Sequence, residues 1–83
     1  MRIVVILFLL LSFLSAPAFA LDMFSSEDAA QKHCPTDIVV WLNIPTGVFH
    51  FKGQRWYANT KSGAYVCKKE AEKEGDRATR NGQ

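Results

Sequence analysis

The chain has 83 residues, of which 48% are hydrophobic and 22% are charged, and its formal net charge at pH 7 is +2. This length accommodates one small domain and excludes a multidomain enzyme. Ten basic residues stand against eight acidic ones, so the overall charge indicates no particular class of partner.

The first twenty residues have the composition of a secretory signal peptide. A basic start at residues 1–2 precedes an apolar run at 3–14, and the small residues Ala18 and Ala20 end the segment. This order predicts export and cleavage after Ala20, with Ala18 as the second choice. The apolar run is shorter than the ~20 residues that a membrane-spanning helix needs. We therefore expect a periplasmic or secreted protein with no stable membrane insertion after cleavage.

Cys34 and Cys67 are the two cysteines of the chain. An even number of cysteines in an exported protein predicts a disulfide. A bridge between them closes a loop of roughly 34 residues, which stabilises a fold by about 3–4 kcal/mol in the chain-entropy model. That is a large share of what so small a core supplies, so the bridge is expected to decide whether the domain folds.

The mature chain begins with a predicted helix and a predicted strand. Two serines and two acids at 25–28 are typical of a helix start, and we expect this helix to reach His33 and to stop before Pro35. Residues 37–43 (DIVVWLN) are β-branched and apolar on both faces. That pattern indicates a strand in the middle of a sheet or covered on both sides.

Short strands and turns alternate through the central part of the chain. Glycine- and proline-containing turns are predicted at 44–47, 52–54 and 59–63, with strands at 48–51 and 55–58 between them. Alternation along the first of these strands places Phe49 and Phe51 on one face and Val48 and His50 on the other.

The last predicted strand, at 64–67, leads into a helix at 68–74 that Gly75 caps. Two opposite-charge pairs support this helix, Lys68–Glu72 and Glu70–Lys73. Residues 76–83 are expected to be a flexible polar tail. The predicted fold is a single small α+β domain over 21–75. It is an antiparallel meander of three to four short strands, flanked by short N- and C-terminal helices and held by one disulfide.

Two patterns carry a resemblance to known proteins. HCPxDxVVWLN (residues 33–43) and GVFHFKGxRWYxxTKxGxYVCxxEAxxxGDR (residues 47–77) together resemble a family of small exported proteins of Gram-negative bacteria. The resemblance implies export and a shared fold, and it brings no activity with it. A shorter pattern, VFH at 48–50 followed by EAxxxG at 70–75, is similar to a small module attached to some secreted bacterial nucleases. Those modules carry paired cysteines that suggest a metal site, and this chain lacks that pairing.

Three kinds of chemistry can be weighed for the histidines and cysteines. His33, Cys34, His50 and Cys67 include the residue types of a zinc site, but no C-x-x-C or H-x-x-x-H spacing preorganises two ligands. His50 is a candidate general base without a nearby carboxylate, since no acid lies between Ile44 and Lys69. Redox-active cysteines are usually close in sequence, and these are not. We therefore predict no metal, no cofactor and no catalytic residue.

Basic and aromatic residues close together favour a binding surface instead. Aromatic rings beside positive charge suit single-stranded nucleic acid, glycans or anionic polymers of the envelope. The alternative for the same residues is a domain core with an ordinary basic rim. The candidate binding residues are His50, Lys52, Arg55, Trp56, Tyr57 and Lys61.

These observations predict a small, monomeric, non-catalytic binding domain of the periplasm or the secreted fraction. Its expected partner is a protein or an anionic envelope polymer, with nucleic acid ranked lower. The alternative function is a metal-binding or nucleic-acid-processing accessory module, and a small enzyme that uses His50 is ranked third.

Overall fold

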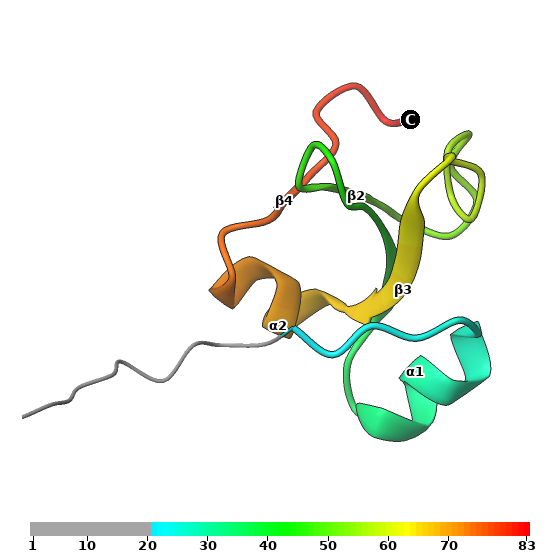
Figure 1. Cartoon of the computed structure of the whole chain (residues 1–83), viewed down its shortest axis with the longest axis vertical. Coiled ribbons are helices and arrows are strands. Elements are labelled where there is room, and N and C mark those ends of the chain that lie inside the picture. Colours follow the sequence, from blue (N-terminus) through cyan, green and yellow to red (C-terminus); the bar gives the residue numbers. More distant parts are fainter. Residues whose placement is uncertain (1–20) are drawn as a thin grey trace, which may run out of the picture.

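A computed structural model describes residues 21–83, and the predicted signal peptide at 1–20 lies outside the described residues. Two short helices and four strands follow one another as α1 (Glu27–His33), β1 (Val39–Asn43), β2 (Val48–His50), β3 (Gly63–Cys67), α2 (Lys68–Lys73) and β4 (Arg77–Ala78). The strands form one sheet in the order β3-β1-β2-β4, in which only the β2–β4 pair is parallel. The predicted small α+β domain is confirmed. Figure 1 shows both helices at one end of the sheet and the C-terminal segment at the opposite end.

β1 is central, as its two-sided apolar character predicts. It pairs with β3 from Val39↔Cys67 to Asn43↔Gly63 and with β2 through Trp41↔His50 and Leu42↔Phe49. The buried cluster of the core is formed by Val40, Leu42, Phe49, Val66 and Ala71. Because α2 supplies one of these residues, the sheet and this helix share a single core.

α1 forms where the sequence places a capping residue. The Ser26 side chain accepts a hydrogen bond from the Ala29 N–H at 3.1 Å, and Glu27 and Asp28 lie in the first turn, where the helix dipole favours acids. Cys34 follows this helix and forms the predicted disulfide with Cys67, with a Cα–Cα distance of 6.4 Å. The bridge joins the end of α1 to the junction of β3 and α2.

α2 receives its cap from a distant residue. Cys67 occupies the N-cap position and offers no capping hydrogen bond. Instead, the Asp37 carboxylate accepts from the Lys69 N–H at 2.9 Å and from the Ile38 N–H at 2.7 Å. Gly75 ends this helix at φ +93°, as predicted. Lys68 and Glu72 pair at 3.1 Å as expected, whereas the Glu70 carboxylate contacts His33 in place of Lys73.

The strand predicted at 55–58 is wrong, because this segment folds into consecutive turns. The Tyr57 N–H donates to the Gln54 carbonyl and the Asn59 N–H donates to the Trp56 carbonyl. Ala58 adopts a left-handed backbone conformation, with φ +54°, which no strand residue has. The fourth strand of the sheet is β4 instead.

β4 lies within the segment that the sequence assigned to a polar tail after the domain. The Arg77 N–H donates to the Gly47 carbonyl at 2.9 Å, and the Thr79 N–H donates to the Phe49 carbonyl at 3.0 Å. Gly47 permits this pairing, because its φ of +69° suits glycine and because Asp76 Oδ1 lies 3.1 Å from where a Cβ would be. The start of the C-terminal segment is therefore part of the sheet, held by these backbone hydrogen bonds and by Ala78, which packs against the core.

Within residues 21–83, no helix has the length and apolar character needed to cross a membrane.

Candidate functional site

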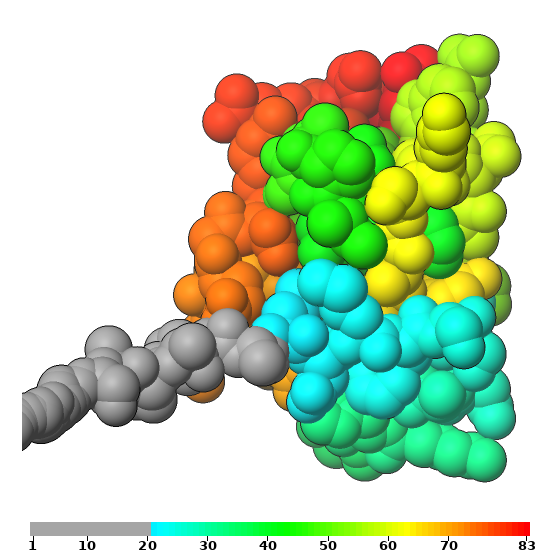
Figure 2. All heavy atoms as spheres, viewed as in Figure 1, coloured from blue at the N-terminus to red at the C-terminus, as the bar shows by residue number. Residues whose placement is uncertain are grey.

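A pocket lies where the C-terminal segment meets the sheet and the 55–61 loop. Its volume is about 660 Å³, within the range of small-ligand sites. Three parts of the chain line it, namely the β1–β2 hairpin, the loop and the segment from Arg77 to Gln83. The loop and the C-terminal segment are joined by a backbone hydrogen bond from the Trp56 N–H to the Gln83 carbonyl at 3.0 Å. In Figure 2 the C-terminal segment (red) runs across the top of the molecule to this loop (yellow-green).

Trp56 is the aromatic residue of this pocket. Its side chain is 36% exposed, and the Arg55 guanidinium lies over the indole ring at 4.8 Å from its centroid. This cation–π contact holds a positive charge beside the pocket. The other aromatic side chains near the loop pack against one another, since Tyr65 contacts both Trp41 and Tyr57 with ring centroids 5.0 and 5.9 Å apart.

The charged side chains of the pocket lining are all basic. Lys61 and Arg77 line it, and no aspartate or glutamate does. Neither they nor Arg55 forms an ion pair among residues 21–83. The Arg77 guanidinium donates one hydrogen bond, to the Ala78 carbonyl at 3.1 Å, and its other donors have no partner in the described part of the chain. The pocket wall thus contains basic side chains and no acidic side chain.

His50 also lines the pocket, from β2. The residue is only 6% exposed, and its Nδ1 atom is buried with no hydrogen-bond partner in the described residues. Buried polar atoms almost always find a partner, so this one is unusual. A proton on Nδ1 would leave a buried N–H donor unpaired, whereas the neutral tautomer with its proton on Nε2 leaves only an acceptor there.

Lys52 and Tyr57, the other two predicted site residues, are held away from the pocket by Glu27. The Lys52 ammonium lies 2.8 Å from one carboxylate oxygen of Glu27, and the Tyr57 hydroxyl donates to the other at 3.1 Å. The hydrogen bonds from Lys52 and Tyr57 lower the pKa of Glu27 below its ordinary value. Burial, and then the hydrogen bond to Glu27, raise the pKa of Tyr57. These two residues stabilise the loop and do not line the site.

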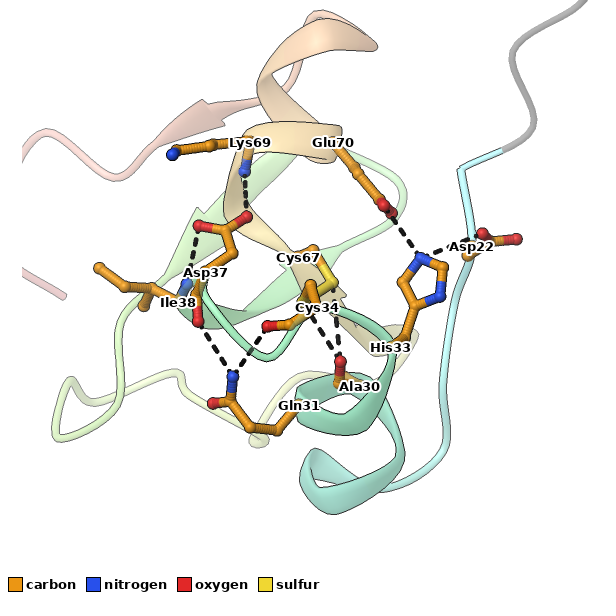
Figure 3. The surroundings of a disulfide bond; sticks show 10 residues. All are labelled: Asp22, Ala30, Gln31, His33, Cys34, Asp37, Ile38, Cys67, Lys69 and Glu70. Carbon is orange, nitrogen blue, oxygen red and sulfur yellow. Dashed lines mark hydrogen bonds and ion pairs between the residues drawn. A yellow bond between two sulfur atoms is a disulfide. The ribbon is translucent and has the colours of Figure 1, made fainter.

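A second polar cluster surrounds the disulfide (Figure 3). His33 Nε2 lies 2.9 Å from the Glu70 carboxylate and 3.3 Å from that of Asp22, and its ring packs on Phe24 with centroids 5.2 Å apart. Glu70 and His33 also approach the Cys67 sulfur, with the three ligand atoms within 4.8 Å of one another. Because Cys34 and Cys67 are bonded to each other, neither supplies the thiolate of the Cys2His2 zinc alternative.

The structure therefore divides the six residues predicted for a binding surface. His50, Trp56 and Lys61 line the pocket, Arg55 stacks at its rim, and Lys52 and Tyr57 belong to the Glu27 contact. Sequence reasoning missed Arg77 and the polar residues after it. The second pattern ends in G-D-R at this position, but that ending does not indicate that the C-terminal segment pairs with the sheet.

Comparison with known protein families, curated proteins and solved structures finds no match to this chain.

Proposed function

We propose that this chain is an exported, non-catalytic binding domain that takes an anionic polymer of the bacterial envelope into the pocket between β2 and the C-terminal segment. The signal-peptide pattern and the disulfide support export, because such bridges persist in oxidising compartments. The resemblance to small exported proteins of Gram-negative bacteria points to the same location.

One observation carries the binding proposal: Lys61 and Arg77 meet Trp56 in a pocket whose wall contains no aspartate or glutamate. In a chain with nearly balanced charges, cations that form no ion pair are where an anion binds with the least competition. A catalytic role for His50 has less support. No aspartate or glutamate lines the pocket to orient the imidazole, and its Nδ1 has no partner among residues 21–83.

Titration of the oxidised mature chain with linear polyphosphate tests this proposal. Two cation contacts predict that the affinity falls about tenfold between about 50 and 200 mM salt. Arg77→Ala is expected to weaken binding and to reduce the slope of log affinity against log salt by about 1. Lys69→Ala removes an exposed cation of α2 outside the pocket and is the matched control. Binding that does not depend on salt, or equal losses in both variants, would contradict the proposal.

A further inference from the structure

The pocket wall is richer in neutral hydrogen-bonding groups than in charge. Beside its two cations, more than half of the residues that line it carry amide or hydroxyl side chains, among them Asn43, Asn59, Thr60, Asn81 and Gln83. Amides and hydroxyls both donate and accept hydrogen bonds. A pocket built for a phosphate backbone needs donors above all, because phosphate oxygens only accept. The mixture of donors and acceptors in this pocket fits a ligand that both donates and accepts hydrogen bonds.

Several of these groups retain hydrogen-bonding capacity. The Asn43 side-chain amide has no partner among residues 21–83. The Thr60 hydroxyl oxygen accepts from Trp41 Nε1 at 2.8 Å, which leaves its own hydrogen to donate. Asn81 is fixed in place because its Oδ1 accepts from the Thr79 hydroxyl at 2.7 Å and its amide donates to Gln83. The wall is thus partly preorganised and partly open to a ligand.

His50 adds no contact to this mixture of donors and acceptors. It is a buried residue of the pocket lining, and its unpartnered Nδ1 is itself buried, so a ligand in the pocket does not reach that atom. The hydrogen-bonding part of recognition therefore rests on the amide and hydroxyl side chains.

The aromatic content argues against single-stranded nucleic acid as the ligand. Proteins that bind it stack successive bases on several aromatic rings. Here Trp56 is the aromatic residue of the lining, and Arg55 lies over one face of its ring. At most one face of the Trp56 indole is free, and it can pack against the apolar face of one ring of a ligand.

We propose that the ligand is an acidic saccharide, in which hydroxyl groups bind the amide and hydroxyl side chains of the pocket while a carboxylate binds Lys61 and Arg77. This inference rests on the proposed function, since it names the kind of anion that the pocket takes. Trp56 then packs against the carbon-bound face of one sugar ring.

Three probes separate the ligand classes on the oxidised mature chain: trigalacturonic acid, its neutral counterpart galactotriose, and an oligothymidylate with an equal number of charges. We expect trigalacturonic acid to bind at least about tenfold tighter than either of the others, the equivalent of about 1.4 kcal/mol. Asn43→Ala is expected to weaken the uronate several-fold and to leave the oligothymidylate unaffected. Thr36→Ala, an exposed hydroxyl of the turn after α1, is the neutral control.

The outcomes distinguish this inference from the proposal beneath it. Equal or tighter binding of the oligothymidylate, with sensitivity to Arg77→Ala, would overturn the saccharide and leave an anion-binding domain. Galactotriose binding as tightly as the uronate would overturn both, because the cations would then have no part in recognition. Failure of all three probes together with polyphosphate would also overturn both.

Discussion

The two ends of this small sheet are built in opposite ways. At the helix end, which comprises α1, α2 and the Cys34–Cys67 bridge, two lysines are paired with acids, Lys32 with Asp28 at 3.4 Å and Lys68 with Glu72 at 3.1 Å, whereas Lys69 and Lys73 form no ion pair among residues 21–83. At the pocket end, which comprises the 55–61 loop and residues 77–83, the cations have no acidic partner in the described part of the chain. The first end contains the disulfide and the ion pairs of the two helices, and the second contains only cations without ion pairs, which are the ones that the proposed ligand would contact.

The largest expected effect is the loss of the disulfide. Replacing both Cys34 and Cys67 with serine should lower the free energy of unfolding by about 3–4 kcal/mol, because the bridge closes a loop between positions 33 apart. Urea unfolding of the oxidised protein and of the double variant measures this difference. An unchanged midpoint would mean that the helix end does not hold the fold.

A smaller loss of stability is expected from Gly63→Ala in β3, the strand that lies between the 55–61 loop and α2 along the chain. A Cβ at this position would overlap the Trp41 ring and would lie 2.7 Å from the Leu42 carbonyl oxygen. The backbone cannot yield, so we expect a loss of about 1–3 kcal/mol. Thermal unfolding measures it, with the exposed neighbour Ser62→Ala as the control. Equal midpoints for the two variants would contradict the close packing of Trp41 on β3.

Asp37→Ala tests the cap that α2 receives from across the chain. The carboxylate accepts from the Lys69 and Ile38 N–H groups, so its removal should cost about 1 kcal/mol, as for other helix caps. Asp37→Asn keeps one acceptor oxygen and should cost less. If urea unfolding ranks the asparagine variant below the alanine variant, the capping role is wrong.

Acidification should weaken the contact that links the two ends, between Glu27 and the pair Lys52 and Tyr57. Hydrogen bonds from these two residues lower the pKa of Glu27 in the folded state below its ordinary value of 4.5. The contact therefore stabilises the fold fully above pH 4.5, and the stabilisation is lost as the pH falls through the folded-state pKa. Glu27→Gln should show a shallower decline of the unfolding midpoint over that range. Parallel curves for the two proteins would refute this assignment.

The smallest expected change in stability is at the pocket end. Lys61→Ala should alter the free energy of unfolding by no more than about 0.5 kcal/mol, because the exposed side chain has no ion-pair partner in residues 21–83. The same variant should weaken the binding of polyphosphate. A loss of stability comparable to that of Asp37→Ala would contradict the inferred difference between the two ends.

Most of the helix end was predictable, because its signals are local and strong. The serine cap, the apolar run of β1, the cysteine pair and Gly75 each indicate one structure through backbone or covalent chemistry. The strand predicted at 55–58 failed for the opposite reason. Its aromatic composition favours a strand, but local turn hydrogen bonds and the reach of Tyr57 to Glu27, 30 positions away, determine its path.

The pocket was half predictable. Its basic and aromatic residues in the 50–61 stretch stand out by type, and three of the six line the pocket. Its other wall depends on β4, a strand of two residues that is held by backbone hydrogen bonds and by the packing of Ala78 against the core. Hydrophobic alternation cannot reveal so short a strand. The sequence also does not reveal that Lys52 and Tyr57 contact Glu27, and because of these contacts neither residue lines the pocket.

The position of the disulfide has a consequence for how this domain withstands proteases. The β1–β2 hairpin and the 55–61 loop, which form two walls of the pocket, lie between Cys34 and Cys67 along the chain. Exposed loops of this kind are where proteases cut first. A single cut there leaves both fragments covalently joined, so the nicked protein migrates as one species until it is reduced and as two afterwards.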